Sequence, residues 1–145
     1  MKTDNGGEYE IGDRNRVRQL RAAARYDRAT VHAILDAGLS AHVAFCDQGR
    51  PAIVPMIYAR DGEMLYLHGA RKARIVQLLE GGAEATLNVT LIDGIVAARS
   101  AFNSSVNYRS VTVFGRPRLV EGEAETIEAM RLISEHLMPG RWDEL

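Results

Sequence analysis

Residues 85–100, with the sequence ATLNVTLIDGIVAARS, carry the clearest strand signal in the chain. Apolar side chains occupy the odd positions from Ala85 to Leu91, and polar side chains occupy the even positions between them. A period of two predicts a β-strand with one face in a core and the other toward solvent. Asp93-Gly94 then predicts a tight hairpin into a further strand, Ile95 to Phe102, because this dipeptide tolerates the positive φ that such turns need.

The rest of the chain shows the same strand pattern at several places, separated by turns and by helical patterns. Strands are predicted from Leu39 to Cys46, Ala52 to Arg60, Met64 to His68 and Tyr108 to Val120. Helices are predicted between Asp27 and Gly38, from about Ala70 to Glu80, and from Ile127 to Leu137. Six strands joined mostly by tight hairpins, with helices inserted at intervals, predict a mostly β, α+β fold, a six-stranded antiparallel barrel with flanking helices. The long crossovers that parallel strands need are missing.

Length, charge and composition narrow the class of protein. The 145 residues suit one domain, and we expect an N-terminal arm over residues 1–26 and one folded domain over 27–145. A net charge of −1 argues against a nucleic-acid binder, and no apolar run approaches the roughly 20 residues of a membrane span. The lone Cys46 excludes an internal disulfide and fits a reducing cytoplasm. Residues 14–25 contain five arginines, which are interpreted as a solvated face.

The passage from Tyr66 to Arg74, YLHGARKAR, carries the strongest functional signal. It leaves a predicted strand through a glycine and enters a predicted helix, where free backbone N–H groups point outward. Arg71, Lys72 and Arg74 add positive charge where the helix dipole is already positive, and a bound phosphate would offset this charge. The alternative is a solvated basic turn, and these residues alone do not decide between the two.

Other candidate residues carry weaker patterns. The four histidines have no metal-ligand spacing, so no metal site is expected. Ser104 and Ser105 have no evident general base, which argues against a serine nucleophile. The polar residues of the stretch 103–110 are unusual in a strand, and they need hydrogen-bond partners if they are buried.

A series of short stretches follows in a recognisable order: RYD (25–27), IVPMIYARDG (53–62), LYLHG (65–69), LIDG (91–94), RSAF (99–102), NYRSV (107–111), FG (114–115) and PGRW (139–142). Together they resemble the pyridoxamine 5′-phosphate oxidase-like family of FMN-binding split barrels, in particular its nitroimidazole-resistance type of flavin-binding protein. Each motif is loose by itself, whereas their order and spacing from Arg25 onward are fairly specific.

The resemblance implies a homodimer with one FMN in each of two clefts between the barrels. The isoalloxazine ring would be lined, partly through backbone groups, by Val54, Pro55, Met56, Ile57 and Tyr58. The ribityl-phosphate end would lie by His68 and Gly69, with Arg71, Lys72 and Arg74 at the phosphate. The second subunit would contribute Asn107, Tyr108, Arg109 and Ser110. His68 and Tyr108 would lie nearest the reacting face, which makes them the candidate catalytic residues.

The sequence also departs from this family. Ala70 and Ala73 stand where relatives often place a serine beside the phosphate, and the loop 103–106 lacks the histidines of many relatives. The substrate-binding arginine and histidine of true pyridoxamine phosphate oxidases have no counterpart, so we do not expect that activity. Relatives commonly continue past PGRW with another barrel strand, which leaves a fragment or a shortened member with an exposed edge as alternatives.

We therefore expect an FMN-binding flavoprotein that acts as an oxidoreductase on a small organic molecule. One alternative is a non-catalytic flavin-binding sensor or store, because no general acid, metal site or nucleophile stands out. Another is a split barrel that binds haem or deazaflavin. A haem would need an axial histidine, for which His68 is the candidate.

Overall fold

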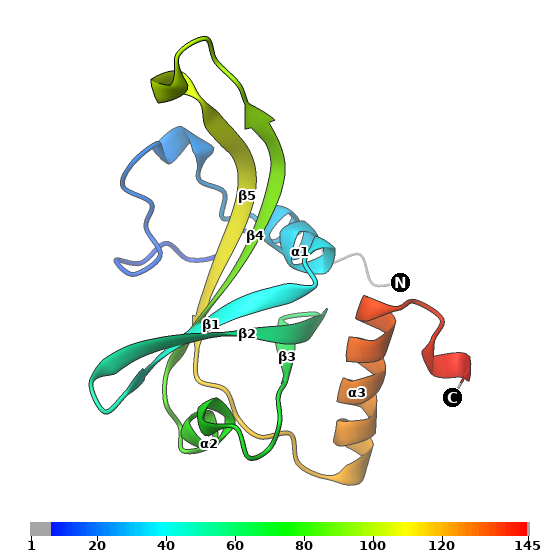
Figure 1. Cartoon of the computed structure of the whole chain (residues 1–145). Helices are drawn as coiled ribbons and strands as arrows, with labels where there is room; N and C mark the ends of the chain where they lie inside the picture. Colours follow the sequence, from blue (N-terminus) through cyan, green and yellow to red (C-terminus); the bar gives the residue numbers. More distant parts are fainter. Residues whose placement is uncertain (1–6, 145) are drawn as a thin grey trace.

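An antiparallel sheet of five strands forms the centre of the molecule (Figure 1). The computed structural model describes residues 7–144, so the first part of the expected N-terminal arm, residues 1–6, lies outside the described residues. The elements are η1 (Arg21–Ala23), α1 (Arg28–Ala37), β1 (Ser40–Asp47), β2 (Arg50–Asp61), β3 (Met64–His68), α2 (Arg74–Glu80), β4 (Ala85–Val96), η2 (Ala101–Asn103), β5 (Ser105–Gly115), α3 (Glu123–Leu137) and η3 (Trp142–Glu144). The strand order is β3-β2-β1-β4-β5, so β3 and β5 are edges and the described sheet is open. The antiparallel α+β class is confirmed.

The number of strands differs from the prediction because the chain does not turn at Asp93-Gly94. Strand β4 continues through this dipeptide and pairs with β5 as far as Val96. The register shifts between Ile92 and Gly94, which makes Asp93 the extra residue of a β-bulge. The predicted hairpin and the separate strand from Ile95 to Phe102 are therefore wrong. Figure 1 shows the result, a two-stranded ribbon of β4 and β5 that extends beyond the other strands.

The sequence predicted the N-terminus of α1 and the turn between β2 and β3 correctly. The Asp27 carboxylate accepts a hydrogen bond from the Thr30 N–H at 2.9 Å and caps α1, and this bond lowers the pKa of Asp27. Gly62 adopts a φ of 56° in the predicted hairpin between β2 and β3. Helix α2 begins at Arg74 rather than Ala70, because residues 71–73 form a turn before it.

The core lies between one face of the sheet and helices α1 and α2. Alternate residues of each central strand point into it, together with Ile34 and Leu35 of α1 and Ile75 and Leu79 of α2. Burying each such side chain contributes about 1.5–3 kcal/mol. Helix α3 packs against β2 and β3 (Figure 1). Within residues 7–144 no helix has the length and apolar character needed to cross a bilayer.

Candidate functional site

Alternation along β2 places the five residues expected at the isoalloxazine ring on two different faces of the sheet. Val54, Met56 and Tyr58 point toward the core, whereas Pro55 and Ile57 point to the opposite face, called here the outer face. Tyr58 is fully buried, so only its backbone could contact a ligand on the outer face. The candidate site is therefore the part of the outer face around Pro55 and Ile57.

The end of β3 completes this corner of the outer face. His68 is the direct cross-strand partner of Ile57, so the two side chains project from the same face. Gly69 follows, and a Cβ at that position would lie 3.0 Å from Met56 Cε and 3.0 Å from Val76 Cγ2. This close packing fixes the point at which the chain leaves the sheet beside His68.

The loop after Gly69 brings exposed cations to the same corner. Arg71 and Lys72 lie in a turn that is closed by a 2.8 Å hydrogen bond from the Ala73 N–H to the Ala70 carbonyl. Neither cation has a carboxylate partner among residues 7–144. Arg74 differs, because its guanidinium pairs with Asp47 at 2.5 Å. Of the three cations predicted at a phosphate, Arg71 and Lys72 are thus available and Arg74 is engaged.

A polar network occupies the centre of the outer face, on β4 and β5. The Asn88 side-chain amide donates to Ser110 Oγ at 2.9 Å and to Thr112 Oγ1 at 3.1 Å, and it accepts from Thr90 Oγ1 at 2.8 Å. On its other side Asn88 faces His42 of β1 across the sheet. Ser110, predicted to face a flavin, is therefore one member of a hydrogen-bonded surface patch.

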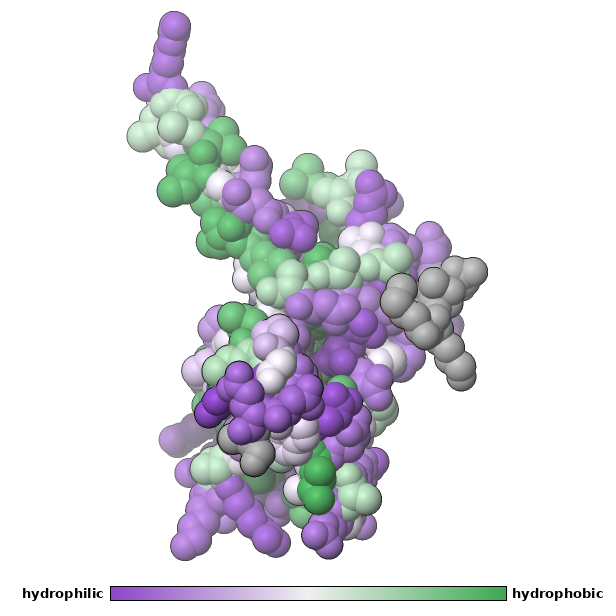
Figure 2. All heavy atoms as spheres, turned by 90° about the vertical axis from the view of Figure 1, so that its right-hand side faces the viewer, coloured by the Kyte–Doolittle hydropathy of each residue, from purple (hydrophilic) through white to green (hydrophobic). Residues whose placement is uncertain are grey.

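Apolar side chains cover the outer face of the ribbon beyond this network. Ile92 pairs with Tyr108 and Ile95 pairs with Val106, and all four are exposed. The bulge at Asp93 is the cause, because one extra residue puts Ile92 and Ile95 on the same face although they are three apart. Figure 2 shows the hydrophobic surface running along this part of the molecule. Such a surface on a free chain marks an interaction site.

The predicted β5 residues lie far across the sheet from the corner at His68. Arg109 points to the other face from Tyr108, and its guanidinium holds the Asp93 carboxylate at 2.8 to 3.2 Å. This ion pair lowers the pKa of Asp93. Because β3 and β5 are opposite edges, one chain does not bring His68 and Tyr108 together.

A cavity of about 790 Å³ lies on the inner side, between the sheet, α2, α3 and the segment 115–122. Its lining is mostly apolar and includes Met56, Leu67 and Ile133, with Arg71 and Arg118 among its charged residues. His68 and Arg71 both line this cavity, so the two residues stand at the boundary between the cavity and the outer face. No group of three or more metal-ligating side chains occurs in the described part of the chain.

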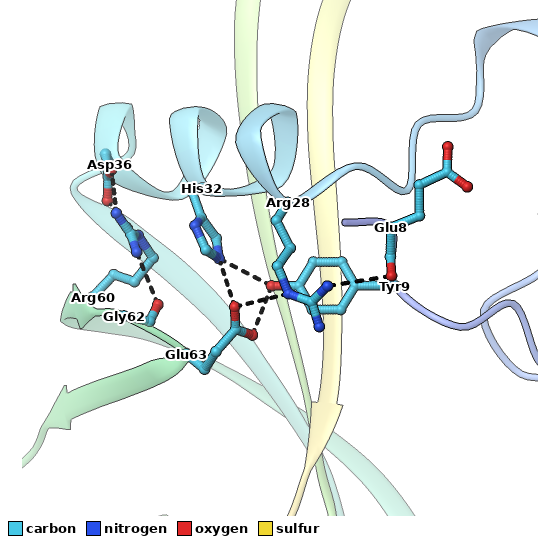
Figure 3. A network of polar contacts seen from close by, with 8 residues as sticks. All are labelled: Glu8, Tyr9, Arg28, His32, Asp36, Arg60, Gly62 and Glu63. Carbon is cyan, nitrogen blue, oxygen red and sulfur yellow. Dashed lines mark hydrogen bonds and ion pairs between the residues drawn. The ribbon is translucent and has the colours of Figure 1, made fainter. Parts of the chain in front are cut away.

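A cluster of polar contacts holds the turn before β3 in place (Figure 3). The Tyr9 hydroxyl donates to Glu63 Oε2 at 2.9 Å and lies 3.0 Å from His32 Nε2. The Arg28 guanidinium donates to Glu63 Oε1 at 3.1 Å and lies over the Tyr9 ring. The N-terminal arm, α1 and the β2–β3 turn thus meet at Glu63, which also lines the inner cavity.

This cluster shifts the pKa values of two of its members. Burial raises the pKa of Tyr9, and the hydrogen bond to Glu63 raises it further, to about 12. Burial also acts to raise the pKa of Glu63, but the Tyr9 hydrogen bond and the Arg28 charge outweigh it and hold that pKa below the ordinary 4.5. The cluster therefore depends on an ionised Glu63.

Sequence reasoning missed several of these residues for identifiable reasons. Polar side chains at Asn88 and Thr90 were visible in the alternation, but nothing local showed that they bond to β5. Tyr9 and Glu63 are 54 residues apart, so only the fold reveals their contact. Ile92 and Ile95 share a face because of a bulge, and the Asp-Gly signal predicted a turn at that point.

Comparison with known proteins gives the family. A family model described as pyridoxamine 5′-phosphate oxidase matches residues 27–145. The chain therefore belongs to the pyridoxamine 5′-phosphate oxidase-like family, which confirms the resemblance noted from its motifs. No curated protein sequence matched the chain.

Solved structures agree with this assignment. The flavocytochrome Anf3 from Azotobacter vinelandii is 41% identical over 92% of this chain and 62% of its own, with a TM-score of 0.83. A FAD and heme binding protein from Mycobacterium smegmatis is 34% identical over 82% of this chain and 58% of its own, with a TM-score of 0.76. This chain thus spans about three fifths of either protein.

A third structure extends the likeness of fold. A candidate 5-nitroimidazole antibiotic resistance protein from Bacteroides thetaiotaomicron is 21% identical over 77% of this chain and 67% of its own, with a TM-score of 0.67. At this identity the comparison concerns the fold alone.

The cluster at Glu63 predicts an acid-dependent loss of stability. A carboxyl group whose folded pKa lies below its unfolded value stabilises the protein above the unfolded value, and this contribution disappears as pH falls through the folded pKa. We expect Glu63→Gln to cost about 1 kcal/mol at neutral pH and to flatten the decline below pH 4.5. Urea unfolding followed by circular dichroism across this pH range measures both effects.

Glu10→Gln is the matched control, since Glu10 lies on the same arm and its carboxylate forms no ion pair with residues 7–144. Identical pH profiles for the wild type and Glu63→Gln would show that the cluster does not stabilise the fold.

Proposed function

We propose that this chain is a flavin-binding oxidoreductase that acts on a small organic molecule, with FMN bound on the outer face beside His68. The observation that carries the proposal is the corner itself, where the chain runs from His68, beside the exposed Ile57, to two cations that have no carboxylate partner among residues 7–144. A flavin presents the matching chemistry, a flat aromatic ring joined to a phosphate. Family membership and the two relatives whose names refer to flavin binding support the same conclusion.

Each group at the corner has a proposed role. Pro55, Ile57 and the backbone of residues 54–58 would contact the isoalloxazine ring, and the backbone at Gly69 would lie by the ribityl chain. Arg71 and Lys72 would pair with the phosphate, with Arg74 near it through its bond to Asp47. A bound flavin would supply hydride and electron transfer. His68 is the side chain that could hold a proton beside the ring.

The phosphate assignment predicts a selective loss of affinity. We expect the double variant Arg71→Gln/Lys72→Gln to bind FMN roughly 10- to 100-fold more weakly, because charged hydrogen bonds to the phosphate are lost. Affinity for riboflavin, which has the ring without the phosphate, should stay unchanged. Titration of the protein into each flavin, followed by flavin fluorescence, gives both constants, and FAD can be measured in the same way.

Arg99→Gln serves as the control variant, since Arg99 is an exposed arginine in the segment that links β4 to β5. Unchanged FMN affinity in the double variant would contradict the phosphate assignment. Oxidation of a reduced nicotinamide nucleotide by the FMN-loaded protein separates an oxidoreductase from a flavin store.

We further propose that two copies associate through their outer faces. In this arrangement Asn107, Tyr108, Arg109 and Ser110 of one copy would reach the flavin of the other. The exposed apolar residues of the ribbon provide the contact surface, with Ile95 81% exposed in the single chain. Because His68 and Tyr108 are on opposite edges, the two candidate catalytic residues could meet only across such a dimer.

A dimer through this surface predicts a response to a single charge. Ile95→Glu would bury a carboxylate in the apolar contact, so we expect it to sediment as a monomer while the wild type sediments as a dimer. Ile127→Glu is the control, because Ile127 is similarly apolar and exposed but lies on α3. A monomeric wild type, or a variant that remains dimeric, would count against this interface.

Haem binding is the second candidate, favoured by the likeness to the flavocytochrome Anf3 and to the FAD and heme binding protein. The inner cavity offers mostly apolar walls, with arginines to pair with propionates, and His68 could provide an axial nitrogen. In a hemin titration we expect His68→Ala to abolish the shift of the Soret band, and His42→Ala to leave it intact. A wild type that shows no Soret shift would exclude this candidate.

A further inference from the structure

Residues 14–25, the second half of the N-terminal arm, concentrate positive charge on a chain that is otherwise acidic. Residues 14–25 contain five arginines and no acidic residue. The rest of the chain has 13 basic and 19 acidic residues, so its formal net charge is −6. Arginines held close together repel one another, and a bound anion would offset this repulsion. A cluster of arginines therefore indicates an anionic partner more strongly than a surface of mixed charge does.

The loop that carries these arginines has a defined internal structure. The Tyr26 hydroxyl donates to the Asn15 carbonyl at 3.0 Å and accepts from the Val17 N–H at 2.8 Å. The Asn15 side chain bonds the Gly12 N–H and the Glu10 carbonyl, each at 2.8 Å. The loop is thus folded around one tyrosine and one asparagine.

A small pocket lies inside this loop. It has a volume of about 250 Å³, and it is lined by Ile11, Arg16, Val17, Arg21, Ala24 and Tyr26. Since a water molecule takes up about 30 Å³ of the liquid, the pocket has room for about eight water molecules. That space suits a molecule with a single small ring.

Arg16 and Arg21 are the two charged residues that line this pocket, and their side chains make no hydrogen bond or ion pair with residues 7–144. Some other arginines of the chain do pair with carboxylates, for example Arg28 with Glu63 and Arg60 with Asp36. In the same loop Arg14 pairs with Glu84 and lies over the ring of Phe114, which ties the loop to the sheet. No carboxylate of residues 7–144 pairs with Arg16 or Arg21.

We propose that this pocket binds a small phosphate monoester that carries an apolar group. Two guanidinium groups match the charge of roughly −2 on a phosphate monoester, and each can bond its oxygens in bidentate fashion. Ile11, Val17, Ala24 and the ring of Tyr26 contact the apolar part. This site is separate from the corner at His68, since it shares no residue with it.

Phenyl phosphate is a suitable probe, because it combines a dianion with one small apolar ring. We expect isothermal titration calorimetry to show that the full chain binds phenyl phosphate more tightly than inorganic phosphate or benzoate. Arg16→Gln and Arg21→Gln should each weaken this binding roughly 10- to 100-fold. Arg18→Gln is the matched control, an exposed arginine of the same loop that does not line the pocket.

The outcomes decide the proposal without reference to the flavin site. Wild-type affinity in Arg16→Gln and Arg21→Gln would overturn it, as would equal losses in all three variants, which would indicate a diffuse charge effect. If phenyl phosphate bound no more tightly than inorganic phosphate, the apolar residues of the pocket would not contribute to binding. That result would also overturn the proposal. FMN affinity, measured in parallel, should be the same in all variants, because Arg71 and Lys72 are unchanged.

Discussion

The buried side chain of Tyr58 is the constraint on which the rest of the structure depends. The Tyr58 hydroxyl donates to the Leu35 carbonyl at 2.5 Å, near the end of α1. The centroid of the His136 ring, on α3, lies 5.5 Å from the centroid of the Tyr58 ring. His136 Nε2 in turn lies 2.6 Å from the Gly38 carbonyl. A Cβ at Gly38 would come within 2.7 Å of the Tyr58 hydroxyl, so glycine is required there. One side chain thus joins β2 to two helices.

This inner anchor determines what the outer face presents. Because side chains alternate along a strand, fixing Tyr58 and Met56 inward places Ile57 and Pro55 outward. Cross-strand pairing then sets His68 beside Ile57, and the packed Gly69 sends the chain toward Arg71 and Lys72. The proposed flavin corner is therefore a direct consequence of packing in the core. The proposed residues of β5 lie at the opposite edge, so the proposed site would need a second copy to include them.

Sequence reasoning succeeded where a signal was local and unopposed. Asp27 caps α1, Asp61-Gly62 turns the chain, and alternation identified the buried side of β4. It failed at Asp93-Gly94, because continued pairing with β5 and the bond between Asp93 and Arg109 overrode a turn-forming dipeptide. The order of the motifs identified the family, whereas the binding site at the corner beside His68 stays a prediction. The fold was needed to show that Tyr58 is buried, that Arg74 is engaged by Asp47, and that the N-terminal loop contains a pocket.

The visible absorption spectrum of the purified protein tests the central claim most directly. It is recorded as isolated, and again after addition of excess FMN and removal of unbound flavin on a desalting column. The account predicts that flavin bands remain after desalting, at a ratio approaching one flavin per chain. A folded, dimeric protein that retains no flavin under these conditions would contradict it.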